Sequence, residues 1–264
     1  MISYLILGPG AMGYFATLGH LQALQDKKEL QKVLELSGAS SGALTGLMYI
    51  LYKGDIKKII KKSLTIDIEK ATKLHLHSFL EHYGFICTSH LKDIMRDMCE
   101  KMMSNPDPTF QELYEFSDIK YHVSAYCVTD NQTEYFCVDT HPQVKILDII
   151  CASFAVPFLF TSVKFNDKLY IDGGTNEKIP ALPFLNKDGH KVYAVEIKRS
   201  DTMGEQITDL KTYTEKLMRS VLFNNRMTYD TIKNKTINLG TINIFDFKMK
   251  DFEKIELYVK GYLS

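Results

Sequence analysis

The sequence has no net charge and none of the cysteine patterns that stabilise small secreted domains or bind zinc. Thirty-two lysines and arginines balance thirty-two aspartates and glutamates, so no overall field favours nucleic acid or another highly charged partner. The five cysteines are odd in number and contain no C-x-x-C pair. This argues against a disulfide framework and against a zinc site, and it suits a reducing compartment.

Long apolar runs are also missing. No stretch reaches the roughly 18 apolar residues that a membrane-spanning helix needs. The first ten residues, MISYLILGPG, contain a short apolar run without a basic segment before it or a clear cleavage site, so we interpret them as a strand and not as a signal peptide. We therefore expect a soluble, cytoplasmic protein that is either free or peripheral to membranes.

The composition is that of one large globular domain. Of 264 residues, 45% are hydrophobic and 24% are charged, which is enough to bury a sizeable core within a single domain over residues 1–264. Strand-like and helix-like segments alternate along the chain. This alternation predicts an α/β fold, a three-layer αβα architecture with a mainly parallel central sheet.

The individual elements are predicted from periodicity and from end signals. Thr109 followed by Glu112 predicts a capping box, and Asn131 lies in the turn of a predicted hairpin. Predicted strands cover 3–7, 33–36, 120–130, 133–140, 168–172, 191–197 and 241–247. Predicted helices cover 14–25, 41–52, 145–157, 205–224 and 250–262, with a helical, charge-rich stretch from 55 to about 103.

Ser40 lies midway between Gly38 and Gly42, where a strand-like run becomes helix-like. In a G-x-S-x-G elbow the serine occupies a sharp, strained turn that exposes its hydroxyl. Glycines avoid collisions with neighbouring backbone, and the following helix directs N–H groups at the reacting centre. An ordinary glycine-rich turn with a serine cap would have the same sequence pattern, so the pattern alone leaves both interpretations open.

A second glycine cluster, GPGAMG at Gly8–Gly13, lies between the first strand and the first helix. It matches the G-x-G-x-x-G fingerprint of dinucleotide-binding oxidoreductases. Such a site needs an acidic residue at the end of the second strand to hold the ribose. Glu35 lies inside that strand and not at its end. This alternative also leaves the glycines around Ser40 unexplained.

An α/β-hydrolase with a Ser-His-Asp triad is a further alternative. His190 follows Asp172 in the chain order that this fold requires. That fold places several strands before its elbow, however, whereas only two are predicted before Ser40. The arrangement is therefore disfavoured.

Three blocks of sequence together resemble the patatin-like phospholipase family. The first two are LGPGAMGYFATLGHLQAL and LSGASSGALTGLMY, and the third is ICASFAVPFLFTSVKFNDKLYIDGGTNEKIP. The third block is similar to the family's A-S-x-A-x-P segment, which leads through a strand to D-G-G and on to a proline, here Pro180. The likeness spans nearly the whole chain and is weakest over residues 55–105.

The resemblance implies a patatin-like fold and a Ser-Asp dyad, with Ser40 as nucleophile and Asp172 as its partner. Gly173 and Gly174 complete the D-G-G turn and let the backbone approach closely, so that the carboxylate meets Ser40 without an imidazole between them. An aspartate near its ordinary pKa of about 3.9 is a weak base. Water exclusion and preorganised N–H donors must therefore lower the barrier. The dyad needs neither a metal nor a cofactor.

The oxyanion loop departs from the family pattern G-G-G-x-[R/K]-G because it has no arginine or lysine. Pro9 has no N–H to donate, so we prefer the alignment that assigns the donors to Gly10 and Ala11. This alignment puts Gly13 at the basic position, and the other alignment also leaves the charge missing. A second function therefore stays open, that of a catalytically weak or inactive homologue that binds membranes or a partner.

Residues 54–70 carry isoleucines at helical spacing with lysines between them. The pattern fits a basic amphipathic helix on an anionic lipid surface, and it equally fits a core-facing stripe with a solvated lysine face. We expect residues 55–105 to supply any helical cap or lid over Ser40. His75 and His77 fall on different helix faces, so no metal site is expected there.

The predicted function is therefore that of a serine acyl hydrolase acting on lipids. The expected substrates are phospholipids, which would release fatty acid in a phospholipase A-type reaction through an acyl-enzyme. The expected partners are the lipid substrate and, through residues 54–70, a membrane surface, and not nucleic acid.

Overall fold

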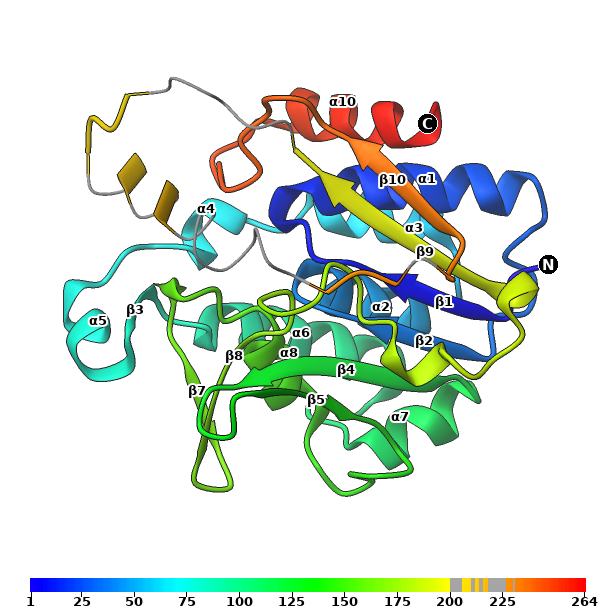
Figure 1. Ribbon diagram of the computed structural model, residues 1–264, viewed down its shortest axis with the longest axis horizontal. Helices are drawn as coiled ribbons and strands as arrows, with labels where there is room; N and C mark the ends of the chain where they lie inside the picture. Colours follow the sequence, from blue (N-terminus) through cyan, green and yellow to red (C-terminus); the bar gives the residue numbers. More distant parts are fainter. Residues whose placement is uncertain (200–205, 210–211, 214–215, 218–226, 230) are drawn as a thin grey trace.

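A mixed sheet of eight strands organises the part of the chain that the computed structural model describes, which is residues 1–199, 206–209, 212–213, 216–217, 227–229 and 231–264 (Figure 1). The strands follow the order β10-β9-β1-β2-β4-β8-β7, and β5 pairs with β4. They are β1 (Tyr4–Leu7), β2 (Glu35–Gly38), β4 (Lys120–Cys127), β5 (Gln132–Phe136), β7 (Val163–Phe165), β8 (Lys168–Asp172), β9 (Val192–Lys198) and β10 (Asn234–Asn238).

The five strands from β10 to β4 run parallel to one another. The remaining strands, β5, β8 and β7, run antiparallel to their neighbours. The predicted mainly parallel sheet is thus confirmed, with an antiparallel extension beyond β4. Two further strands, β3 (Gly84–Ile86) and β6 (Phe158–Phe160), form a separate parallel pair.

Helices form where the apolar spacing and the caps predict them. Thr109 and Glu112 form the predicted capping box: the Glu112 N–H donates to Thr109 Oγ1 (3.2 Å), and the Thr109 N–H donates to Glu112 Oε2 (2.7 Å). The helices are α1 (Tyr14–Asp26), α2 (Ser41–Leu51), α3 (Ile56–Leu64), α4 (Ile68–Ala71), α5 (Leu76–His82), α6 (Ser89–Met103), α7 (Phe110–Ser117), α8 (Ile146–Ser153) and α10 (Asp251–Tyr262).

The two faces of the sheet are covered differently. Leu5 and Leu7 of β1 belong to the main core, which α1, α2, α6 and α8 share. Ile6, which points to the other face, belongs to a smaller core with Phe184 of the 3-10 turn η2 (Leu182–Phe184). The helix predicted over 205–224 lies largely outside the described residues.

The last predicted strand, at 241–247, is wrong. The chain instead forms β10 just before it, an edge strand whose mostly exposed, polar side chains give little apolar signal. Residues 241–247 are irregular, and Ile242, Ile244 and Phe247 pack against the main core. The Asn243 side chain accepts the Phe245 N–H (3.0 Å) and stabilises a turn there.

Candidate active site

Ser40 lies on a strained turn between the end of β2 and the start of α2. Its φ of 55° and ψ of −129° place it in a region that L-residues other than glycine rarely occupy. The side chain is only 5% exposed. The backbone therefore has the conformation that a nucleophile elbow requires, and an ordinary serine cap would not need it.

Close backbone packing accounts for the glycines on each side of this turn. A Cβ at Gly42 would lie 2.1 Å from the carbonyl oxygen of Leu7, and one at Gly38 would lie 2.8 Å from Ala43 Cα. Neither neighbour is a flexible side-chain end, so the backbone itself would have to move. The elbow therefore packs closely against the end of β1, where the glycine-rich loop starts.

The registers along β4 bring Ser40 and Asp172 toward each other. Gly38, the last residue of β2, pairs with Val123, and Asp172, the last residue of β8, pairs with Ala125. Because β5 occupies the other edge of β4 along 123–127, β2 and β8 share one edge. They run in opposite directions, so their carboxyl ends converge, about 7 Å apart along β4.

Ser153, the last residue of α8, contacts both converging segments. Its Oγ accepts the Ser40 N–H (2.9 Å), and its carbonyl oxygen accepts the Gly173 N–H (2.9 Å). It is fully buried. Sequence reasoning gave this serine no role, although it is the serine of the A-S-x-A-x-P segment. That place in the segment is the signal that could have identified it.

The D-G-G turn also contacts the glycine-rich loop. Asp172 is 2% exposed, and its Oδ1 accepts the Gly174 N–H (2.7 Å), which orients the carboxyl group. A Cβ at Gly174 would lie 2.6 Å from Pro9 Cγ. The turn therefore lies between α8 and the loop of residues 8–13.

The backbone N–H groups of residues 8–13 differ in whether they already donate a hydrogen bond. Pro9 has no N–H, and three other residues donate to backbone carbonyls. Within the described residues, the N–H groups of Gly10 and Ala11 have no acceptor, and these are the two predicted oxyanion donors. The bonds already made are Gly8 N–H to Val195 O (2.9 Å), Met12 N–H to Ile244 O (3.0 Å) and Gly13 N–H to Gly10 O (2.7 Å).

An apolar pocket lies beside Ser40. It has an empty volume of about 730 Å³, including the part open to solvent. Apart from Ser40, Ser41, Thr72 and the hydroxyl of Tyr14, the lining side chains are apolar. Six of the lining residues come from the stretch 55–105. The lining consists of Ala11, Met12, Tyr14, Ser40, Ser41, Leu44, Ile66, Ile68, Thr72, Leu91, Ile94, Met95, Phe154, Val156, Phe160, Phe245 and Phe247.

Three phenylalanines connect the Ser40 end of this pocket to the segment before α10. Phe154 follows Ser153 directly and packs edge-to-face on Phe160, with ring centroids 6.1 Å apart. Phe160 packs in the same way on Phe247, at 5.9 Å. Edge-to-face pairs of this kind are stabilising beyond the area they bury, so the wall is well defined along its length.

The alternative triad is not assembled. His190 lies in the 3-10 turn η3 (Gly189–Lys191), which precedes β9, and its side chain is exposed. It is therefore at the amino end of the parallel strands, whereas Ser40 follows the carboxyl end of β2. Glu35 is likewise not available to a ribose, because it contacts Lys187 and His122.

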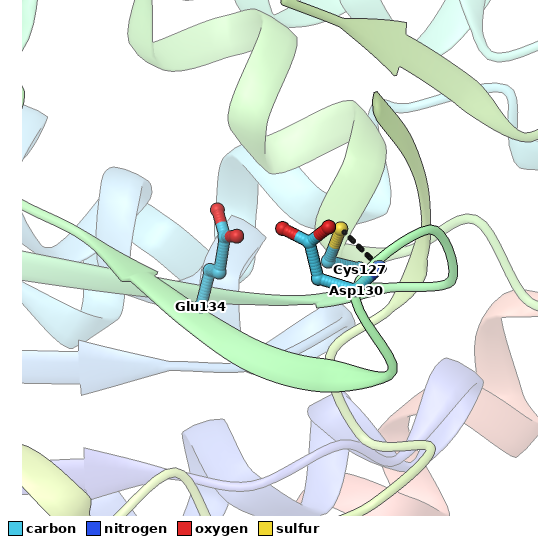
Figure 2. Close-up of side chains that lie close together, drawn as sticks. All are labelled: Cys127, Asp130 and Glu134. Carbon is cyan, nitrogen blue, oxygen red and sulfur yellow. Dashed lines mark hydrogen bonds between the residues drawn. The ribbon is translucent and has the colours of Figure 1, made fainter. Parts of the chain in front are cut away.

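Within the described residues, one group of metal-type donors lies close together, at the β4–β5 hairpin (Figure 2). Cys127, Asp130 and Glu134 have ligand atoms within 4.8 Å of one another. Lys168 Nζ lies 2.6 Å from Asp130 Oδ2 and 3.0 Å from Glu134 Oε1, and the Tyr170 hydroxyl donates to Glu134 Oε2 (2.8 Å). The lysine already forms ion pairs with both carboxylates, so the cluster fits an ion-pair network better than a metal site.

The lysine-rich segment 54–70 is amphipathic, and its apolar side is occupied. Ile56 and Ile59 of α3 are fully buried in the main core, as in the core-facing interpretation. Lys57 and Lys58 are exposed. Within the described residues, no helix combines the length and the apolar character that crossing a bilayer requires.

Comparison with known proteins gives relatives of both sequence and fold. The "Probable lipid hydrolase 463L" of Invertebrate iridescent virus 6 is 26% identical over 266 residues, covering 97% of this chain and 85% of the viral protein. The crystal structure of VipD from Legionella pneumophila matches 99% of this chain with a TM-score of 0.62 and 17% identity. ExoU, a type III effector of Pseudomonas aeruginosa, matches 99% with a TM-score of 0.53 and 14% identity.

The chain spans 65% of VipD and 52% of ExoU, and at these identities the two structures show a common fold. The family model of the patatin-like phospholipases matches residues 5–185. This match includes the glycine-rich loop, the Ser40 elbow and the D-G-G turn, and it covers well over half of the sequence. The chain therefore belongs to the patatin-like phospholipase family, and its fold is the patatin-like fold.

Proposed function

We propose that this protein is a serine acyl hydrolase that releases fatty acid from lipids, phospholipids above all, through a dyad of Ser40 and Asp172. The observation that carries the proposal is the convergence of β2 and β8 on Ser153, beside an apolar pocket. A strained serine, a buried carboxylate and uncommitted backbone N–H groups are the components of acyl transfer.

In the first half of the reaction, Ser40 Oγ attacks the acyl carbonyl carbon while Asp172 takes the hydroxyl proton. The oxygen that becomes negative accepts hydrogen bonds from the N–H groups of Gly10 and Ala11. When the ester bond breaks, Asp172 returns the proton to the departing alcohol, which is a lysolipid if the substrate is a phospholipid. The acyl group remains on Ser40 as an ester.

In the second half, water attacks this ester while Asp172 takes a proton from it. The loop again stabilises the negative oxygen of the tetrahedral intermediate. Collapse of this intermediate releases the fatty acid, and Asp172 returns the proton to Ser40 Oγ, which restores the hydroxyl. Each oxyanion donor contributes on the order of 3 kcal/mol in related sites. The amino end of α2, which starts at Ser41, adds a favourable dipole at the same point.

The pocket supports an aliphatic substrate. Its walls are aliphatic and aromatic, and its polar side chains include Ser40 and Ser41 at the elbow. A fatty acyl chain would gain the free energy of apolar burial along this wall while its carbonyl lies at Ser40. The name of the viral relative, a lipid hydrolase, agrees with this substrate class.

A second candidate function is lipid binding without turnover. It is favoured by the loop, which has no arginine or lysine. A Cβ at Gly13, the aligned basic position, would lie 2.9 Å from Ile197 Cγ2 and 3.1 Å from Leu239 Cδ1, so this packing leaves little room for a long side chain. We prefer catalysis, because backbone strain at Ser40 is costly and has no use in a passive binder.

We further propose that residues 55–105 act as a cap over the pocket, since Ile66, Leu91 and Met95 from this stretch line it. Peripheral membrane contact through 54–70 would have to be mainly electrostatic, because Ile56 and Ile59 of α3 are buried and Ile60 is partly buried against the core. Exposed Lys57 and Lys58 provide positive charge near the pocket-lining segment. Such contacts weaken at high ionic strength.

A fluorophosphonate probe on the purified protein tests catalysis directly. Wild type should be labelled, and Ser40→Ala should not. Ser162→Ala, which removes an exposed hydroxyl bonded to His82 O, is the matched control and should be labelled like wild type. The same proteins, mixed with phosphatidylcholine vesicles, should release fatty acid in the same pattern by mass spectrometry. A folded wild-type protein that neither reacts nor releases fatty acid would favour the binding function.

A further inference from the structure

A second cluster of nucleophilic and titratable side chains lies away from the pocket. Cys137 directly follows β5, His122 lies in β4, and Glu35 begins β2. Val123 of β4 pairs with Phe136 of β5, so the next residues, His122 and Cys137, lie opposite each other across the two segments. His122 Nε2 lies 3.1 Å from Glu35 Oε2. Lys187 Nζ lies 2.6 Å from the other carboxylate oxygen, Oε1. Thiol, imidazole and carboxylate thus form a connected series.

The alternation of side chains along β4 places this cluster on the face opposite the main core. Tyr121 and Val123 are part of the main core, so His122 between them points to the other face, where it meets the edge of Phe184 at a centroid distance of 5.5 Å. Cys137 and His122 are 5% and 7% exposed. The turn that follows Cys137 is exposed at residues 139–140, so the thiol lies just below the surface.

The charged groups around Cys137 include more than its histidine. Lys120 of β4 acts on it electrostatically and is itself paired with Asp139 at 2.6 Å. Thr140 Oγ1 lies 3.5 Å from the thiol, and His141 Nδ1 lies 2.9 Å from that hydroxyl. Glu35, with its partner Lys187, faces His122 from β2 and from the segment after η2.

This environment lowers the thiol pKa of Cys137, whereas the thiol pKa values of other buried cysteines are raised. Burial is the largest cause that raises the pKa of Cys99 and Cys151, each to about 12. Burial also raises the pKa of Cys137, but hydrogen bonds with His122 and Thr140 outweigh it and lower this pKa to about 7. The thiolate, and not the thiol, is the form of cysteine that reacts with electrophiles, and a neighbouring imidazole favours it.

We propose that Cys137 is a redox-sensitive modification site, in which His122, oriented by Glu35, holds the sulfur as a thiolate that hydroperoxides oxidise. The thiolate attacks the nearer peroxide oxygen, the O–O bond breaks, and a sulfenic acid forms as sulfur loses two electrons. The departing hydroxide, or alkoxide from an organic hydroperoxide, takes the proton of the His122 imidazolium and leaves as water or alcohol. A thiol reductant restores the cysteine.

The test is the pH dependence of alkylation by iodoacetamide in the native protein, with each cysteine quantified by mass spectrometry. Cys137 should reach half of its maximal rate near pH 7, and partly exposed Cys87 serves as the internal reference. His122→Gln should slow Cys137 alkylation at pH 7 about tenfold, which corresponds to a change of one pKa unit or more. Glu35→Gln should slow it less, in the same direction.

Hydrogen peroxide followed by dimedone should then label Cys137 in wild type, and the label should disappear in His122→Gln. The proposal is overturned if the Cys137 rate rises only around pH 8.5, the ordinary thiol range, or if it does not respond to His122→Gln. Alkylation of the buried Cys99 and Cys151 would reveal unfolding of that variant. In that case the test of the proposal is the pH profile of wild-type Cys137 together with the rate in Glu35→Gln. Fluorophosphonate labelling of Ser40 should not change in Cys137→Ser, so the two proposals fail independently.

Discussion

Ser40 and Cys137 lie on the same sheet, yet the structure surrounds them with different kinds of support. Ser40 follows the carboxyl end of β2, where a strained backbone, a buried carboxylate and two backbone N–H groups are held by four separate segments. Cys137 lies opposite the amino-terminal half of β4, at a residue without a positive φ, with side chains as its partners. An alcohol does not ionise near neutral pH and must be activated during the reaction, whereas a thiol needs only a neighbouring imidazole. The first site should therefore be sensitive to backbone changes and the second to side-chain changes.

The largest effect expected from this comparison is on hydrolysis. Ser40→Ala and Asp172→Asn should each lower the rate of fatty-acid release by roughly 10³-fold or more, because a nucleophile and its base act as one unit. Cys137→Ser should stay within about twofold of wild type. The rates are measured on vesicles by mass spectrometry, with circular dichroism as the check on folding. Near-normal turnover in Asp172→Asn would refute the dyad.

The next effect is on stability and tests the backbone of the elbow. Gly42→Ala places a methyl group 2.1 Å from the Leu7 carbonyl oxygen, so the elbow and the end of β1 must separate. We expect a loss of about 3 kcal/mol in the free energy of unfolding, measured by urea denaturation. Gly189→Ala is the matched control, because the nearest atom to its Cβ lies at 3.9 Å and its stability should hardly change. Equal stability of the two variants would contradict the packing argument.

Ser153→Ala is expected to have a smaller effect on stability and a clear effect on rate. It leaves the buried Ser40 N–H without its acceptor, which costs about 1–3 kcal/mol. The elbow should then lose its position relative to Asp172, and kcat should fall roughly ten- to a hundredfold with little change in KM. A variant that loses stability but keeps kcat would limit Ser153 to a structural role.

The same contrast explains what could be predicted from the sequence. Ser40 with its two glycines and Asp172 with the next two are local patterns, and the match of three such blocks to a known family connected them. The convergence of β2 and β8 on β4 could not be predicted, because it depends on strand register and on an antiparallel β8 beyond a parallel sheet. Ser153 was missed for the same reason, since its two bonds reach distant segments.

Nothing in the sequence connects Cys137, His122 and Glu35 with one another. They are brought together across three strands by pairing alone, and none stands in a recognisable spacing. β10 was missed because an edge strand with polar side chains has no apolar alternation to detect. The apolar residues of 241–247 predicted a strand, but in the structure they belong to an irregular segment that packs against the core.

The smallest expected effect separates two glutamates, the half-buried Glu35 and the buried Glu177, by the sign of the pH dependence of stability. At Glu35, burial raises the pKa, but bonds with Lys187 and His122 outweigh it and the pKa is lowered. At Glu177, burial raises the pKa more than its bonds with Tyr135 and Tyr229 lower it. Glu35 thus contributes stability above its unfolded pKa that is lost as pH falls through the lower folded value. Glu177 contributes stability below its unfolded pKa that is lost as pH rises through the higher folded value.

Thermal unfolding of the two glutamine variants between pH 4 and pH 7 measures these signs. Relative to wild type, Glu35→Gln should lose more stability at pH 7 than at pH 4, because only the ionised carboxylate makes its full interactions with Lys187 and His122. Relative to wild type, Glu177→Gln should be more stable at pH 7 than at pH 4, because it removes a charge that burial disfavours. Each kcal/mol corresponds to about 2–4 °C in Tm for a chain of this size, so differences of a few degrees decide the matter. If Glu35→Gln loses no more stability at pH 7 than at pH 4, the carboxylate of Glu35 is not stabilised by its cationic partners, and the orienting role given to it beside His122 and Cys137 would lose its physical basis.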